Sequence, residues 1–420
     1  MSNSDGYILI LGGEFALRER VLAGALRAGG GRPVFTLAKG RLGNTMKFFD
    51  GFIAADVADP AAVVDAARRF EREHGLRPAA AVPMNDFTVR SALALAKEFT
   101  LLGNPEATVD VCRDKFLMKQ RLQAAGLPVP RFAAFDSLAQ LRALAGDFGY
   151  PLVIKPRELA GSVGVIKVHD AGELDAAFAR CQQDIRNLGG VWRTPEDVFQ
   201  VEQYVPAQQE VSVEVFNHGD LHRALAVTDK HLGPEPYFVE TGHSVPSVHG
   251  ENRALIDIAE RACAALDIRH GIAHFEARIT PEGEVRIIEV GARTGGDAIM
   301  DLVERVYGIN PYELHVGSYL GSTAVLPKTL LPRGLSAVAF LKAPVGRIAR
   351  VHAAGALPES VVNLQISAKP LDASEPAVSW RAREGSVELF WKGRPPETKL
   401  HDHLDLAQQL SARLFEMQSA

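Results

Sequence analysis

The stretch His274–Asp297, HFEARITPEGEVRIIEVGARTGGD, decides the fold because it predicts a β-hairpin that carries acidic residues. Strand-forming residues occupy Phe275–Thr280 and Val285–Val290, on either side of a Pro-Glu-Gly turn. Two such runs separated by a short glycine-containing turn are typical of two antiparallel strands.

The register of this hairpin places two glutamates on the same face of the sheet. If Thr280 pairs with Val285, then Glu276 lies directly opposite Glu289. Two like charges in this position repel each other and would destabilise the hairpin. We therefore expect a cation between the two carboxylates.

A divalent metal is one cation that fits, because Mg²⁺ prefers carboxylate and phosphate oxygens as ligands. Alternatively, one or both glutamates face solvent or pair with Arg278 or Arg286 of the same hairpin. A shift in register of one residue would separate the two acids and exclude a shared metal. The hairpin alone leaves these alternatives open.

The bulk composition limits the class of protein. The chain has 420 residues, which suits two to four structural units, and a net charge of −5 without a basic run, which argues against nucleic acid as a partner. No signal peptide and no apolar run of about 20 residues is seen, so we expect no membrane partner and a cytoplasmic location. Cys112, Cys181 and Cys263 form no paired pattern and are expected to be buried thiols.

The N-terminal part, residues 1–107, alternates strands with helices, which predicts a doubly wound parallel α/β domain. Gly12–Phe15 (GGEF) is not a dinucleotide-binding GxGxxG motif and fits a tight turn better. The expected strands are Tyr7–Leu11, Pro33–Leu37, Ile53–Ala55 and Ala79–Pro83, and the expected helices are an Ala/Leu-rich segment before Gly29 and Ala61–His74.

Residues 108–205 begin with an amphipathic helix, Thr108–Ala125, which contains Asp114 and Lys115 and ends at a glycine and two prolines. A small α/β segment follows. Its expected strands are Arg131–Phe135, Pro151–Lys155, Ile166–His169 and Phe199–Tyr204, its helices are Leu138–Phe148 and Ala171–Cys181, and Arg186–Asp197 is expected to be a surface loop.

Residues 206–420 are predicted to be a mixed α+β part built around the hairpin. The expected elements are strands Glu210–Phe216, Ser336–Leu341 and Gly385–Trp391, a helix Ala254–Leu266, and a closing helix after His403.

Two motifs point to phosphate binding. Lys155 ends an apolar strand before a proline (VIKP), where an ammonium can reach into a cleft, and Gly161–Gly164 (GSVG) can present backbone N–H groups. Further on, Glu202–Val205 (EQYV) can offer backbone groups to an adenine edge, and Glu210 can accept hydrogen bonds from ribose hydroxyls. Each motif alone also fits an ordinary surface lysine, turn or strand.

Taken in order, these motifs resemble the ATP-grasp superfamily: Asp114–Pro130 (DK…M…AGLPVP), VIKP, GSVG, VEQYV…E and FEAR…IIEVGAR. The resemblance implies an N-terminal α/β domain (1–107), a small lid subdomain (108–205) and a C-terminal ATP-grasp subdomain with a terminal extension (206–420). ATP would lie between the last two.

The resemblance also implies roles for individual residues. Many family members have an Asn two residues after the second glutamate, where this chain has Gly291. Arg293 matches an arginine that steadies an acyl phosphate. The remaining implied roles are phosphate binding by Lys115 and the catalytic Lys155, a covering loop of Ser162, Val163 and Gly164, adenine contacts by Glu202, Gln203 and Val205, ribose binding by Glu210, and coordination of two Mg²⁺, or Mn²⁺ in their place, by Glu276 and Glu289.

Within the superfamily, the segment Glu240–His243 (ETGH) and the run ARTGG resemble bacterial L-amino acid ligases that form dipeptides. This resemblance implies that Glu240 and His243 face the amino-acid substrates. Asp297 and His274 are further candidates. Alternatively, Asp297 is the N-cap of a helix over Ala298–Tyr307, and His274 is an ordinary strand residue.

The expected function is that of an ATP-dependent carboxylate–amine ligase, which forms an amide through an acyl phosphate and releases ADP and phosphate. Its partners would be small amino acids or carboxylates, and a homodimer is the commonest form if it oligomerises. The alternatives are an ATP-grasp carboxylase or purine-pathway ligase, and a non-catalytic nucleotide-binding protein of the same fold.

Overall fold

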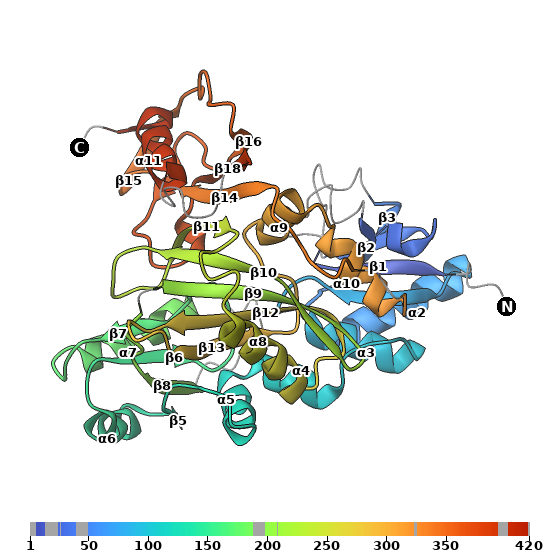
Figure 1. Cartoon of the computed structure of the whole chain (residues 1–420), viewed down its shortest axis with the longest axis horizontal. Coiled ribbons are helices and arrows are strands. Elements are labelled where there is room, and N and C mark those ends of the chain that lie inside the picture. Colours follow the sequence, from blue (N-terminus) through green and yellow to red (C-terminus); the bar gives the residue numbers. More distant parts are fainter. Residues whose placement is uncertain are drawn as a thin grey trace.

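The computed structural model describes residues 6–12, 24–25, 27–38, 49–187, 198–207, 209–322, 326–393 and 402–418, whose strands form four sheets. Figure 1 shows the N-terminal sheet at one side, the largest sheet in the centre and the last part of the chain above it. The predicted loop over Arg186–Asp197 begins too early, because Arg186 ends a helix, and residues 188–197 lie outside the described residues, as does most of the helical segment predicted before Gly29.

The N-terminal sheet is parallel with strand order β3-β2-β1-β4, which confirms the predicted α/β fold of this part. Strand β1 is buried on both faces. Helices α2 and α3 cover one face of the sheet, and α9 (Ile299–Tyr307), α10 (Pro311–Tyr319) and the central sheet cover the other. The elements are β1 (Tyr7–Leu11), β2 (Val34–Ala38), β3 (Gly51–Ala54), α2 (Pro60–His74), β4 (Pro78–Pro83) and α3 (Val89–Phe99).

The helix predicted over Thr108–Ala125 is two helices, α4 (Glu106–Arg113) and α5 (Lys115–Ala124). Asp114 between them is extended, and its carboxylate accepts hydrogen bonds from the backbone N–H groups of Phe116 and Leu117. The prediction was wrong because Asp is a strong N-cap, and here it starts a new helix. As a result, Lys115 opens α5.

Helix α5 packs through Met118 and Leu122 against the central sheet. The lid itself is an antiparallel sheet of order β5-β8-β6-β7 with α6 and α7 packed on its apolar face. The division of the chain at residues 107 and 205 stays a prediction. The lid elements are β5 (Phe132–Phe135), α6 (Leu138–Phe148), β6 (Leu152–Pro156), β7 (Ile166–Val168), α7 (Leu174–Arg186) and β8 (Phe199–Gln203).

The central sheet has eight antiparallel strands in the order β13-β12-β9-β10-β11-β14-β18-β16. One face is covered by α8 with α4 and α5, and the opposite face meets α9 and α10. Its elements are β9 (Gln209–His218), β10 (Leu221–Leu232), β11 (Glu240–Val245), α8 (Arg253–Ala265), β12 (His270–Ile279), β13 (Val285–Gly291), α9 (Ile299–Tyr307), α10 (Pro311–Tyr319), β14 (Gly334–Leu341), β16 (Val361–Ile366) and β18 (Gly385–Lys392).

The hairpin of β12 and β13 confirms that Glu276 lies opposite Glu289. The predicted first pair is wrong by one residue, however, since Ile279 rather than Thr280 lies opposite Val285. A β-bulge restores the register: Ala277 pairs with Ile287 and Glu276 with Glu289, so Ile288 is the extra residue.

The last part of the chain forms a satellite core beside β14 and β18. Its elements are β15 (Gly346–Val351), β17 (Ala373–Ser374), the short 3₁₀ helix η2 (Trp380–Ala382), α11 (Asp402–Leu414) and β19 (Phe415–Met417). The three cysteines are free and buried, as predicted. None of the described helices has the length and apolar character needed to cross a bilayer.

His315 joins the N-terminal sheet to the central sheet and is expected to make stability depend on pH. Its ring accepts a hydrogen bond from the backbone N–H of Ile272 at 2.8 Å and donates one to the carbonyl of Pro83 at 2.9 Å. Burial lowers the pKa of His315 to about 4, although the bond to Pro83 opposes this shift. A histidine with a lowered pKa stabilises the fold fully above pH ~6.5, and this stability is lost as the pH falls through about 4.

We therefore expect the free energy of unfolding to fall by about 3 kcal/mol more in the wild type than in His315→Gln between pH 7 and pH 4. Urea titrations across this range measure the difference. His74→Gln, at the exposed end of α2, is the matched control and should keep the wild-type slope. Parallel pH profiles for wild type and His315→Gln would contradict the prediction.

Candidate ATP and substrate site

One face of the central sheet is polar and faces the lid. Along β9, residues 211, 213 and 215 are valines that pack in the core with α8, while the alternate residues are Glu210, Ser212 and Glu214. Strand β12 follows the same alternation, with Phe275 in the core. Because successive side chains point to opposite faces, the polar residues of neighbouring strands gather on one surface. They are His274, Glu276 and Arg278 of β12, beside those of β9.

A pocket lies between this surface and the lid sheet. It brings together residues from Lys115 to Arg293. Twelve predicted site residues line it: Lys115, Lys155, Ser162, Val163, Glu202, Gln203, Val205, Glu210, Glu240, Glu276, Glu289 and Arg293. Four do not line it: Gly164, His243, His274 and Asp297.

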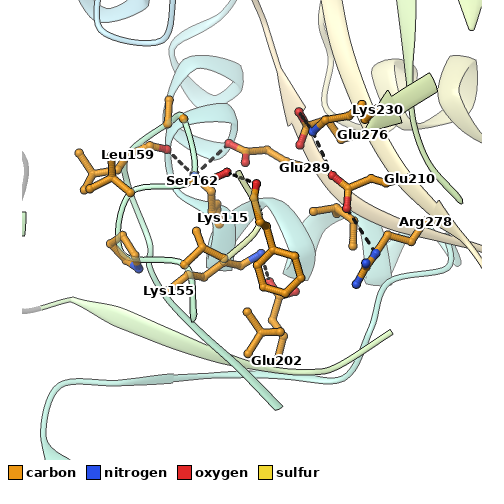
Figure 2. A pocket seen from close by; sticks show the side chains of 18 of the residues that line it. Lys115, Lys155, Leu159, Ser162, Glu202, Glu210, Lys230, Glu276, Arg278 and Glu289 are labelled. Atoms are coloured by element: carbon orange, nitrogen blue, oxygen red, sulfur yellow. Dashed lines mark hydrogen bonds and ion pairs between the residues drawn. The ribbon is translucent and has the colours of Figure 1, made fainter. Parts of the chain in front are cut away.

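The two predicted phosphate-binding lysines are buried and ion-paired (Figure 2). Lys115 Nζ lies 2.9 Å from Glu289 and donates to the carbonyl of Leu159 at 2.6 Å. Lys155 Nζ lies 2.6 Å from Glu202. Burial raises the pKa of Glu202, but the ammonium groups of Lys119 and Lys155 outweigh it and lower the pKa overall.

Lys119 belongs to this group, although the sequence analysis did not identify it. Its fully buried ammonium lies 3.3 Å from Glu202 and donates to the carbonyls of Ile287 and Ile288 at the β-bulge. Burial lowers the pKa of Lys119 to about 8, against the opposing effect of Glu202. Its position four residues after Lys115 in α5, on the same helix face, is the signal that could have found it.

Each of the two facing glutamates lies beside a lysine: Glu276 beside Lys230 and Glu289 beside Lys115. Lys230 of β10, another residue not identified from sequence, lies 2.8 Å from Glu276, 3.0 Å from Glu210 and 3.5 Å from Glu240 (Figure 2). Burial lowers the pKa of Lys230, but Glu276 and the other carboxylates raise it well above its ordinary value. Lys115 serves Glu289 in the same way.

The alternative partners within the hairpin are wrong. Arg278 lies 3.3 Å from Glu210 and donates to the carbonyl of Val205, and Arg286 pairs with Glu284. Arg278 lies opposite Glu210 in the pairing of β12 with β9, so the sheet register directs it away from Glu276.

His274 is buried behind Glu276 and supports it. One ring nitrogen contacts Glu214 at 2.5 Å and the other contacts Glu276 at 3.0 Å. Burial lowers the pKa of His274, but the charge of Glu214 and the bonds to both acids raise it to about 9. His274 is therefore more than an ordinary strand residue, yet the structure places it outside the pocket wall.

Arg293 is held by a residue from the N-terminal domain. Its Nε lies 2.7 Å from Asp86, which follows β4, and its Nη1 donates to the carbonyl of Thr294 at 3.0 Å. Asp86 was not identified from sequence, although polar residues after parallel strands are often functional. The segment from Arg293 to Asp297 is not helical.

Asp297 is part of a second ion-paired group. It does not cap α9, since Ala298 holds the N-cap position in a left-handed conformation. Its carboxylate accepts from Arg383 Nη1 at 2.8 Å and contacts His243 Nε2 at 3.3 Å. Arg383 also lies 3.1 Å from Glu240, which lines the pocket. Arg383 was not identified from sequence.

The loop after β6 closes one side of the pocket. Ser162 has a left-handed backbone and donates its hydroxyl to the carbonyl of Phe238 at 2.7 Å. A Cβ atom at Gly161 would lie 2.1 Å from Trp380, and one at Gly164 would lie 3.2 Å from the sulfur of Cys181. The tight packing at both glycines explains why this turn needs residues without side chains.

The donor set fits Mg²⁺ held jointly with phosphates. Glu276 and Glu289 face each other and both line the pocket. The described residues hold no group of three or more His, Cys, Asp or Glu side chains arranged for a metal ion. Two carboxylates with phosphate oxygens and water are the usual mode of Mg²⁺ binding, so this site would hold the metal only together with a nucleotide.

Comparisons with known proteins agree with this geometry. Residues 148–301 match the sequence model of the ATP-grasp domain family. Carnosine synthase 1 of Gallus gallus is 31% identical over 295 residues, and alanine–anticapsin ligase of Bacillus subtilis is 25% identical over 262 residues. These matches cover 66% and 59% of this chain but only 31% and 55% of the relatives, so the chain spans a part of their length.

Among solved structures, L-amino acid ligase from Bacillus licheniformis superimposes with a TM-score of 0.81 at 21% identity, covering 99% of this chain and 100% of that chain. The likeness extends over the N-terminal sheet, the lid and the central sheet. The chain thus has the ATP-grasp fold and contains an ATP-grasp domain at residues 148–301.

Proposed function

We propose that the protein is an ATP-dependent carboxylate–amine ligase that joins an amino acid, or another small carboxylate, to an amino acid. The observation that carries the proposal is the single pocket wall shared by Lys115, Lys155, the facing pair Glu276 and Glu289, and Arg293. The two ligases among the relatives support it, since their names describe the joining of amino acids.

The charge distribution of the pocket supports ATP binding at the lid end. Lys115 is ion-paired with Glu289 and Lys155 with Glu202, so their ammonium groups can exchange a carboxylate for a phosphate at little cost. Gln203 and Val205 at the end of β8 would present backbone groups to adenine, and Glu210 would accept hydrogen bonds from ribose.

Glu276 and Glu289 would hold Mg²⁺, and two ions are proposed. The metal, when bound, would neutralise phosphate oxygens and align them for transfer. In the absence of a nucleotide, Lys230 and Lys115 compensate the same carboxylates. Arg293 would stabilise the negative oxygen that develops when an amine attacks the activated carboxylate. The loop around Ser162 would exclude water, which otherwise hydrolyses the acyl phosphate.

The substrate end of the pocket is proposed to lie at Glu240, with His243 and Asp297 behind it. Arg383 links Glu240 to Asp297 and stacks 3.6 Å from the centre of the Phe340 ring. The acidic side chains are thereby held in place but partly neutralised. This arrangement suits an amino acid with an uncharged side chain, whose α-ammonium group would contact Glu240, better than a substrate with two positive charges.

The test is a screen for ADP release with pairs of amino acids and small carboxylates, with Mg²⁺ and without bicarbonate. We expect release only when a carboxylate and an amine are both present, with a stoichiometric amide product detected by mass spectrometry. Release that requires bicarbonate would support a carboxylase instead. If the protein binds ATP but releases no ADP with any of the pairs tested, the result would support a non-catalytic protein.

The variant Arg383→Met tests whether the amino acid and ATP bind at different ends of the pocket. Loss of the guanidinium frees Glu240 and Asp297 to move apart, so we expect the KM for the amino acid to rise about tenfold while the KM for ATP stays within about twofold. Steady-state kinetics with each substrate varied in turn measure both constants. Arg381→Met, in the short helix η2 that directly precedes Arg383, is the control. Equal increases in both KM values would contradict this division of the pocket.

A further inference from the structure

Gly291 leaves a space that an ion pair fills. The pairing of β12 with β13 places Gly291 opposite His274 and two residues beyond Glu289. A Cβ atom on Gly291 would lie 3.2 Å from Nε of Arg293 and 3.4 Å from Oδ1 of Asp86. These distances are at or below ordinary van der Waals contact, so any larger side chain would have to displace the ion pair.

The ion pair fixes the orientation of the Arg293 guanidinium. Nε donates to Asp86 Oδ2 at 2.7 Å, and Nη1 donates to the carbonyl of Thr294 at 3.0 Å. A guanidinium is rigid and planar, so two bonds to different nitrogens determine where the third nitrogen points. The side chain of Arg293 lines the ATP pocket and is only 14% exposed.

Asp86 is suited to this task by its own surroundings. It is 6% exposed, and Arg113 of α4 lies 3.8 Å from its other oxygen. Burial raises the pKa of Asp86, but Arg293 and Arg113 lower it by more, so the side chain is an anion. The residue follows β4 of the N-terminal sheet, and the neighbouring Thr294 hydroxyl donates to the carbonyl of Met84 in the same segment.

We propose that Asp86 is the positioning residue for Arg293: the N-terminal domain inserts this carboxylate into the space left by Gly291 and thereby aims the guanidinium at the reacting carboxyl group. The inference rests on the proposed ligase function. It gives the N-terminal domain a direct part in the reaction, because a correctly aimed Arg293 requires this domain to be docked. Gly291 and Asp86 act as a complementary pair.

The kinetic test is Asp86→Asn, which keeps the shape of the side chain and removes its charge. We expect kcat to fall by about 10²-fold, as for small misplacements of catalytic groups, while the KM for ATP stays within about twofold. Gly291→Ala should also lower kcat, by about tenfold, because its methyl group pushes on Arg293 without changing any charge.

The matched control is Arg90→Gln. Arg90 of α3 makes a two-pronged ion pair with Glu158, at 2.9 Å for both bonds, between the N-terminal domain and the lid. This variant removes an interdomain ion pair of the same kind that does not touch Arg293. It should keep kcat within about twofold, so that a loss in Asp86→Asn is not explained by weaker domain docking alone.

A second readout does not depend on turnover. The Nε–H of Arg293, donated to a buried carboxylate, should give a protected ¹H–¹⁵N cross-peak that Arg293→Lys deletes and Asp86→Asn shifts and weakens. An unchanged cross-peak in Asp86→Asn, or a wild-type kcat in that variant, would overturn the inference. A wild-type protein that shows the cross-peak but ligates no amino acid pair would instead overturn the proposed function and leave the ion pair supported.

Discussion

Glu289→Gln is expected to lower Mg²⁺-dependent ADP release by about 10²–10³-fold, the range for removing one preorganised electrostatic group. The change removes one of the two facing carboxylates that would hold the metal and keeps the size of the side chain. It also releases Lys115 from its 2.9 Å contact, although Lys115 still donates to the carbonyl of Leu159. The fold should therefore survive, with an unchanged far-ultraviolet circular dichroism spectrum.

The assay is a coupled ADP-release measurement over a range of MgCl₂ concentrations. Glu282→Gln is the matched control, because Glu282 lies exposed in the turn of the same hairpin and should keep wild-type rates. Near-normal turnover in Glu289→Gln, at the same MgCl₂ requirement as the wild type, would remove the basis for placing the metal at this hairpin.

Lys230→Met is expected to be the most destabilising single substitution in the pocket, by about 3–5 kcal/mol, because breaking a buried ion pair leaves uncompensated charge. Methionine keeps the length of the side chain, but Glu210, Glu240 and Glu276 then lie together with no ammonium between them. We further expect MgCl₂ to restore part of this loss, since a divalent cation can replace the missing charge.

Urea denaturation with and without MgCl₂ measures both effects. The control is Lys97→Met, which breaks the surface pair with Glu106, where the two side chains are 55% and 62% exposed. An exposed pair of this kind contributes at most about 1 kcal/mol. A Lys230→Met variant as stable as the wild type in the absence of divalent cations would show that the three acids are not charged together.

The sequence could predict the parts of the site that lie close together along the chain. Glu276 and Glu289 belong to one hairpin, and Lys155 and the Ser162 loop follow a single strand. These residues are close in the sequence, so the local residue pattern is sufficient to predict that they are close in the structure. Parts of the lid were predictable for the same reason, since Gly149 directly follows α6 and Pro151 directly precedes β6.

The residues that were not found depend on contacts between distant segments. Lys230 enters the pocket because β10 pairs with β9 across a turn at Gly219, whereas the residue pattern predicts the first of these strands only, as Glu210–Phe216. Asp86 follows β4 of the N-terminal sheet, whereas Arg383 directly follows the short helix η2 near the end of the chain. Their partners, Arg293 and Asp297, are more than 80 positions away in the sequence, and no pattern in the neighbouring residues indicates such a contact.

The β-bulge at Ile288 has a consequence for how this hairpin can vary. The turn between β12 and β13 is one residue out of step with the predicted pairing, and the bulge cancels that difference before the strands reach Glu276 and Glu289. The spacing of the two carboxylates is thus independent of the turn that joins their strands. Lys119 stabilises the β-bulge, because its ammonium group donates hydrogen bonds to the carbonyls of Ile287 and Ile288. Insertions or deletions at Pro281–Glu284 should therefore leave Glu276 opposite Glu289.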